Sequence, residues 1–180
     1  NDPAGARQLF AQFNQMYPEN LLRAEVRLAI GRSFEAEGNW DAAATNYTSW
    51  SGTFTNHYLL PQAQFRLAWD QYMAGHETNA LMLFTNFIAR YPTNELSARA
   101  QFWIGDFYFR QPDMQAAEIN YKAVFQNTNW PVSELTYEAR MSAGRAAALR
   151  FDYKAAINHF TNLFTPDCPH DLQVQANIAF

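Results

Sequence analysis

Cysteine is almost absent from this chain, which has one, Cys168, among its 180 residues. A single thiol cannot form an internal disulfide or build a multi-cysteine metal site. Its position beside Pro169 is typical of an unreactive loop residue. Long apolar runs are missing too. No stretch approaches the roughly eighteen consecutive apolar residues that a spanning helix needs, so we expect no membrane span within the chain.

The chain also lacks a large excess of charge of either sign. The chain has 13 basic and 17 acidic residues, a net charge of −4, and no long run of either sign. Surfaces that bind nucleic acid or anionic membranes carry clustered basic residues. The composition therefore predicts neither kind of partner.

Catalytic and metal-binding patterns are absent as well. The histidines lie far apart, with no His-x-x-x-His pair and no glutamate placed to complete a zinc site; they are His57, His76, His159 and His170. There is no Gly-rich phosphate loop. Solvated charge and turn capping explain Asp106 and Asp113. We therefore predict no enzymatic activity, no metal and no cofactor, since an all-helical enzyme would need a convergent polar site.

What the chain does have is a repeat: a small residue, an alanine twelve positions on, and an aromatic residue four further. The four copies are Gly31/Ala43/Tyr47, Ala68/Ala80/Phe84, Gly105/Ala117/Tyr121 and Gly144/Ala156/Phe160. They begin 37, 37 and 39 residues apart. This spacing indicates one supersecondary unit copied end to end.

Each copy is predicted to fold as two antiparallel helices. Helical apolar spacing predicts first helices at 22–37, 61–74, 96–110 and 135–150, and second helices at 40–50, 78–91, 114–126 and 153–164. Glycine and proline punctuate the turns. The small residues let the paired helices approach closely, and the aromatic residue fills the space one turn along. In the third repeat, Glu118 lies on the second helix, 114–126, and is expected to face solvent.

These positions resemble the tetratricopeptide repeat, whose signature has small residues at its eighth and twentieth positions and an aromatic residue at its twenty-fourth. Pro92 adds the proline expected at the thirty-second. The resemblance implies an all-α, right-handed α-solenoid forming a single domain over 1–180, with repeats at 22–55, 59–92, 96–131 and 135–168 and half-repeats at 4–18 and 171–180. The period exceeds the usual length of about 34 residues, and Gln71 stands where an aromatic residue is usual.

The Tyr17-Pro18 and Tyr91-Pro92 pairs, together with the longer period, look like the bacterial envelope subgroup of this family. That subgroup includes the Tol-Pal-associated periplasmic protein and the outer-membrane assembly lipoprotein. The likeness implies a periplasmic, outer-membrane-associated or extracellular location. The chain begins with Asn1 rather than Met, which indicates processing or trimming, with any targeting signal upstream.

The resemblance also implies a binding surface, because first helices form the concave wall of such solenoids. Carried over by repeat position, the wall comprises Glu25, Leu28, Arg32, Glu35, Phe65, Trp69, Tyr72, Met73, Arg99, Phe102, Asp106, Phe109, Arg110, Glu138, Met141, Arg145 and Leu149. Aromatic side chains flanked by arginines suit an extended or helical peptide segment. The alternative is that several of these aromatic residues only pack between helices. The Lys/Asn pattern that clamps a terminal carboxylate in some relatives is missing.

The two ends suggest a second possibility, self-assembly. The N-terminal half-repeat carries Leu9, Phe10 and Phe13, and the C-terminal one carries Val174, Ile178 and Phe180, so both should expose apolar surface. Joining the tail of one copy to the head of the next would complete a repeat and build a fibre. Our leading hypothesis is a non-enzymatic scaffold that binds a protein or peptide; the alternatives are a head-to-tail structural subunit and a fragment whose flanking repeats are missing.

Overall fold

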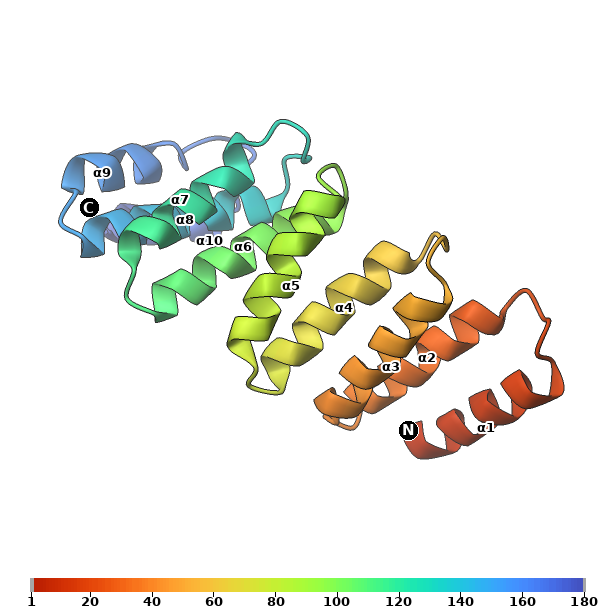
Figure 1. The fold of residues 1–180 in the computed structure, drawn as a ribbon. Helices are drawn as coiled ribbons and strands as arrows, with labels where there is room; N and C mark the ends of the chain where they lie inside the picture. Colours follow the sequence, from red (N-terminus) through yellow and green to blue (C-terminus); the bar gives the residue numbers. More distant parts are fainter. Residues whose placement is uncertain (1, 180) are drawn as a thin grey trace. The chain divides into compact units, whose positions relative to one another are not determined.

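The computed structural model describes residues 2–179, within which it contains ten α-helices and no strand (Figure 1). The helices are α1 (Pro3–Met16), α2 (Arg23–Glu35), α3 (Trp40–Thr53), α4 (Leu60–Met73), α5 (Glu77–Arg90), α6 (Glu95–Arg110), α7 (Met114–Gln126), α8 (Glu134–Leu149), α9 (Tyr153–Thr161) and α10 (His170–Ile178). The all-helical prediction is confirmed. Each predicted repeat helix is present, with ends within three residues of those expected.

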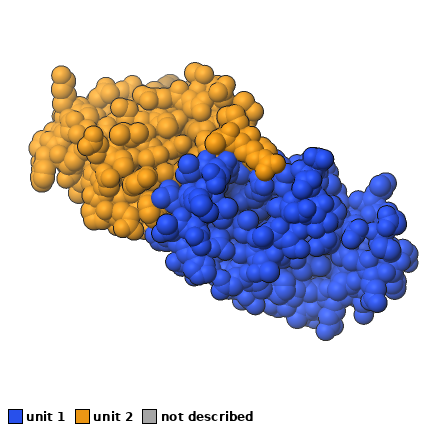
Figure 2. Space-filling view, in the orientation of Figure 1, with its two compact units in different colours: residues 1–87 blue, residues 88–180 orange. Residues whose placement is uncertain are grey.

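The chain forms two compact units, residues 1–87 and residues 88–180 (Figure 2). Unit 1 holds α1 to α4 and most of α5, and unit 2 holds the end of α5 and α6 to α10. The single domain over residues 1–180 stays a prediction.

The turns inside three of the four repeats share the same side-chain cap. Asn39, Asp113 and Asp152 each accept a hydrogen bond from the backbone N–H three residues later, which caps the second helix. Gly38 and Gly75 end two of the first helices with φ values of 71° and 85°, a conformation that glycine adopts without steric cost. The capping role expected of Asp113 is confirmed.

The small residues on the first helices meet aromatic rings. A Cβ built on Gly105 would lie 2.6 Å from the Tyr121 ring, and one built on Gly31 would lie 2.5 Å from the Tyr47 ring. Gly144 meets Phe160 in the same way. The glycine therefore makes room for the ring sixteen residues later. In the repeat without a glycine, Ala68 and Phe84 are both fully buried.

The alanines on the second helices are core residues. Their exposed fractions are 0%, 0%, 0% and 3% for Ala43, Ala80, Ala117 and Ala156. Three of them belong to the core clusters that also contain the aromatic residue of the same repeat. A methyl group so completely covered offers no surface to a partner. These four positions of the repeat signature therefore serve helix packing, and they do not belong to a binding site.

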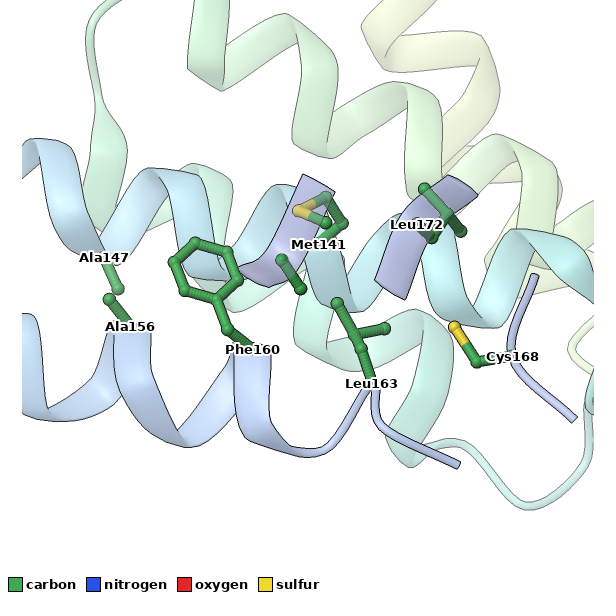
Figure 3. Packing of buried hydrophobic residues seen from close by; sticks show 8 residues of the cluster. Met141, Ala147, Ala156, Phe160, Leu163, Cys168 and Leu172 are labelled. Carbon is green, nitrogen blue, oxygen red and sulfur yellow. The ribbon is translucent and has the colours of Figure 1, made fainter. Parts of the chain in front are cut away.

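Each unit has its own core. In unit 1, Trp50 is fully buried with Leu28, and its indole N–H donates to the Ala24 carbonyl over 2.7 Å. In unit 2, Phe160, Met141 and the residues around them fill the space between α8, α9 and α10, as Figure 3 shows. Leu28 and Met141 were expected on the concave wall, but both side chains are buried by neighbouring helices and offer no open surface there.

Two further expectations concern single residues. Cys168 lies in the connection between α9 and α10, as expected of a loop residue, and is buried in the unit 2 core. The departure at Gln71 does not separate α4 from α5, because its side chain accepts a hydrogen bond from Asn79 across the helix pair. The Phe65 ring supports the same contact, lying 5.4 Å from the ring of Phe84.

Candidate functional site

In unit 1, the predicted wall is carried by the first helices α2 and α4. An ion pair between Arg66 and Glu35 joins the two helices. Trp69 and Met73 lie one turn apart on α4, and each side chain is 40% exposed. The Trp69 ring contacts the ring of Tyr72, with centroids 5.6 Å apart, so its position is held from within the helix.

Arg32 lies on α2 and is exposed. No hydrogen bond or ion pair links its guanidinium to another described residue. Phe65, by contrast, is half-buried and packs against Phe84 and Phe87 in the α4–α5 contact. Of the wall residues predicted in unit 1, the structure therefore leaves Arg32, Trp69 and Met73 open to solvent and uses Phe65 in packing.

A polar network lies behind this surface. The Tyr47 hydroxyl donates to Glu35 over 2.8 Å, and Arg66 pairs with the same carboxylate. Burial, chiefly, and the neighbouring Glu35 charge raise the pKa of the Tyr47 phenol. Asp70, which follows Trp69 on α4, is completely buried. No sequence pattern indicated this network, because its members come from three helices and follow no local spacing.

In unit 2, the aromatic residues of the predicted wall take part in helix packing. Phe102 and Phe109 are half-buried, and their ring centroids lie 5.4 and 6.5 Å from that of Tyr121. The Tyr121 hydroxyl donates to Asp106 over 2.6 Å. Burial raises the pKa of Asp106, although this hydrogen bond and Arg110 oppose the change. Asp106 is therefore a half-buried packing partner, and reading it as a solvated charge was wrong.

The arginines of the unit 2 wall are accessible. Arg110 is exposed and lies 5.7 Å from the centroid of the Trp103 ring. Arg145 is exposed and donates to Gln175 over 2.8 Å. Unit 2 thus offers exposed cations and the exposed Leu149 beside packed aromatic rings, whereas unit 1 offers an exposed aromatic ring.

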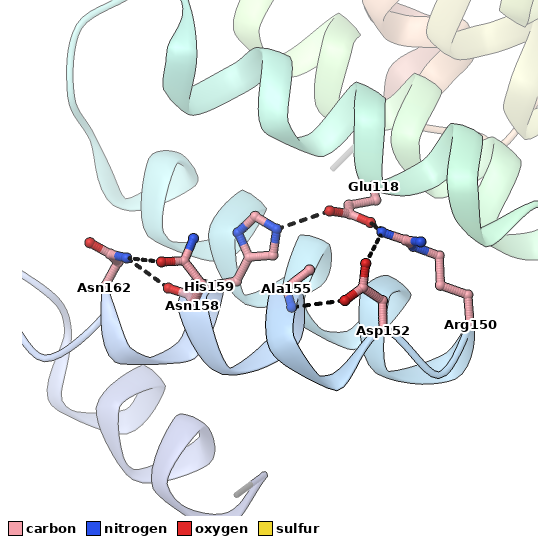
Figure 4. Close-up of polar contacts among 7 residues, drawn as sticks. All are labelled: Glu118, Arg150, Asp152, Ala155, Asn158, His159 and Asn162. Carbon is pink, nitrogen blue, oxygen red and sulfur yellow. Dashed lines mark hydrogen bonds and ion pairs between the residues drawn. The ribbon is translucent and has the colours of Figure 1, made fainter.

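Glu118 is buried, contrary to expectation. It is 5% exposed, and its carboxylate accepts a hydrogen bond from Arg150 over 2.8 Å and contacts the His159 ring nitrogen at 3.1 Å, as Figure 4 shows. Arg150 also pairs with Asp152 at 2.9 Å. This network joins α7 to α9 and to the turn between α8 and α9. The sequence missed it because its members come from neighbouring repeats.

Neither a metal centre nor a membrane span was found in the described part of the chain. No group of three or more His, Cys, Asp or Glu side chains within residues 2–179 could hold a metal ion. Over the same residues, every helix is too short or too polar to cross a bilayer.

The terminal helices expose part of their apolar surface. Leu9 on α1 is 66% exposed and Ile178 on α10 is 80% exposed. Val174 is also exposed, whereas Phe10 and Phe13 are half-buried. Phe180 lies outside the described residues. Head-to-tail association of these helices stays a prediction.

Comparison with known proteins supports the repeat assignment. Residues 62–94, which cover most of α4, all of α5 and the turn after it, match the family model described as tetratricopeptide repeat. No curated protein matches the chain in sequence.

Similar folds occur among solved structures. A tetratricopeptide repeat protein from Parabacteroides merdae matches 89% of this chain with a TM-score of 0.68 and 17% identity, and this chain spans 59% of its length. The MamA protein matches 89% of the chain, and 80% of its own length, with a TM-score of 0.66 and 18% identity. BtubC from P. vanneervenii matches 98% of the chain, and 79% of its own length, with a TM-score of 0.69 and 15% identity. The fold is therefore an α-solenoid of helix pairs of the tetratricopeptide type.

Proposed function

We propose that the chain is a non-enzymatic scaffold that binds a protein or peptide segment through the first helices of unit 1. Tetratricopeptide folds generally serve protein–protein interaction. The observation that carries the proposal is Trp69, whose large side chain is 40% exposed yet held against Tyr72. Tryptophan is enriched among residues that dominate binding energy, because its ring supplies a large contact area at low entropic cost.

The neighbouring side chains fit a short segment with mixed chemistry. Met73 extends the apolar surface by one helical turn and adapts readily to different partners. Arg32, on the adjacent first helix, provides several N–H donors to a carboxylate or a backbone carbonyl. A segment that presents an apolar side chain beside an acceptor group would satisfy both.

Site-specific photocross-linking tests this location. A photoreactive phenylalanine analogue replaces Trp69 in one version of the full chain and Met82 in another, and both are irradiated in extract of the native source. Met82 is a matched control because it is 55% exposed on the second helix α5 of the same unit. We expect one defined adduct at position 69 and not at 82. Equal labelling at both positions, or none at 69, would contradict the proposal.

We also propose a location in the bacterial cell envelope. The Tyr17-Pro18 and Tyr91-Pro92 pairs support it, through the resemblance that they carry. Fractionation of the native source, followed by immunodetection, tests it. Recovery with the cytoplasmic fraction alone would exclude an envelope location.

A further inference from the structure

Asp70 is an unusual buried acid in the last turn of α4. Its exposed fraction is 0%, and neither carboxylate oxygen has a hydrogen-bond partner within the described residues. An ionised carboxylate is rarely buried without a partner, because losing its hydration costs several kcal/mol. A group in this position is therefore expected to neutralise rather than stay charged.

The charges that face Asp70 make ionisation still less favourable. Arg66 lies one turn earlier on α4, but its guanidinium pairs with Glu35 of α2 through Nη1, and its buried Nε forms no hydrogen bond to Asp70. Glu35 also accepts the hydroxyl of Tyr47 on α3. The Arg66 cation thus pairs with Glu35 and not with Asp70, and a second negative charge at Asp70 would face the charge on Glu35.

We infer that Asp70 is protonated in the folded protein, and that the packing of α2, α3 and α4 is coupled to the uptake of one proton. Acidification through the neutral range then tightens unit 1, and a rise in pH loosens it. This property goes beyond the proposed scaffold function and does not depend on what the first helices bind. It does concern the helix that carries Trp69.

The direction of the coupling follows from two pKa values. Burial, chiefly, and the Glu35 charge raise the pKa of Asp70 to about 8 in the fold, while Arg66 opposes the rise. In an unfolded chain, aspartate has a pKa of about 3.9. Between these values the folded form binds one proton more than the unfolded form. The stabilisation is complete below about pH 4, declines as the pH rises, and is lost near pH 8. Between these values the unfolding constant rises by up to tenfold for each pH unit.

Urea unfolding of the full chain at pH 5, 6, 7 and 8 tests the coupling. The variants are Asp70→Asn, which is isosteric and neutral, and Asp70→Leu, which guards against a folding defect specific to the amide. We expect the unfolding constant of the wild type, divided by that of either variant, to rise on the order of a hundredfold or more between pH 5 and pH 8.

A control variant and a second measurement complete the test. Asp167→Asn alters an exposed carboxyl between α9 and α10 and should follow the wild-type pH dependence. Infrared difference spectra of wild type minus Asp70→Asn at pH 6.5 should show a protonated carboxyl band that disappears by pH 9.5. A pH-independent ratio of unfolding constants would overturn the inference. If neither variant folds, the infrared spectrum of the wild type alone is the test. A wild-type spectrum that shows only ionised carboxylates at pH 6.5 would also overturn the inference.

Discussion

At the scale of single residues, the glycines in the helices have sharply different surroundings. A Cβ on Gly105 would overlap the buried Tyr121 ring, whereas one on Gly52 in α3 would meet no atom within 4 Å. The same substitution, glycine to alanine, should therefore have opposite effects at the two positions.

We expect Gly105→Ala to lower the free energy of unfolding by about 1–3 kcal/mol, because the ring has no room to retreat. Gly52→Ala should raise it by about 0.5 kcal/mol, because alanine loses less backbone entropy in a helix. Urea melts of both variants provide the comparison. If the two variants have equal free energies of unfolding, the close contact between position 105 and the Tyr121 ring is contradicted.

Phe151 is a second residue whose backbone predicts its behaviour. It adopts a φ of 65° and is 77% exposed, in the turn where the first two repeats have Gly38 and Gly75. A bulky residue is strained in this region. We expect Phe151→Gly to stabilise the protein by about 1 kcal/mol in thermal melts. Phe151→Ala is the control, because it removes the ring and keeps the strain; a matching gain there would exclude the backbone explanation.

At the scale of helices, the contact between α7 and α9 depends on a buried acid. Glu118→Gln removes the charge that faces His159 and Arg150. Because His159 is itself 4% exposed, water cannot replace the lost interaction. We expect the substitution to lower the free energy of unfolding by about 1–3 kcal/mol. Glu19→Gln, at an exposed position before α2, should change it little. If urea melts give Glu118→Gln and Glu19→Gln the same free energy of unfolding, Glu118 does not stabilise the contact between α7 and α9.

The helices were predictable from the sequence because their signals are local. Apolar spacing, the turn residues Gly38 and Gly75, and the caps at Asp113 and Asp152 all act within one repeat. Burial by the next repeat is not local. That is why Glu118 was expected in solvent, and why the polar network around Asp70 had no sequence signal.

The residues predicted for the concave wall show the same difference between local signals and burial by neighbouring helices. Trp69 was placed on a first helix by repeat position, and its side chain is indeed 40% exposed. Leu28 and Met141 were placed by the same reasoning but are buried. Repeat position gives the side of the helix on which a residue lies. How much of the side chain stays open depends on the size of the residues on neighbouring helices, which one repeat does not contain.

At the scale of the whole molecule, the two units are built from the same repeat and differ in their surfaces. Unit 1 combines an exposed Trp69 with the proton-coupled packing around Asp70. Unit 2 packs Phe102 and Phe109 against Tyr121 and exposes arginines nearby. If binding follows the exposed aromatic surface, unit 1 supplies most of the affinity for a partner segment.

Calorimetric titration with the segment recovered by cross-linking at position 69 tests this account most directly. The full chain, Trp69→Ala and Met82→Ala are compared, with circular dichroism to verify that each variant keeps its helical content. The account predicts that Trp69→Ala weakens binding by at least about 2 kcal/mol, roughly thirtyfold, while Met82→Ala binds like the wild type. Unchanged affinity of a folded Trp69→Ala variant would contradict the proposed binding surface.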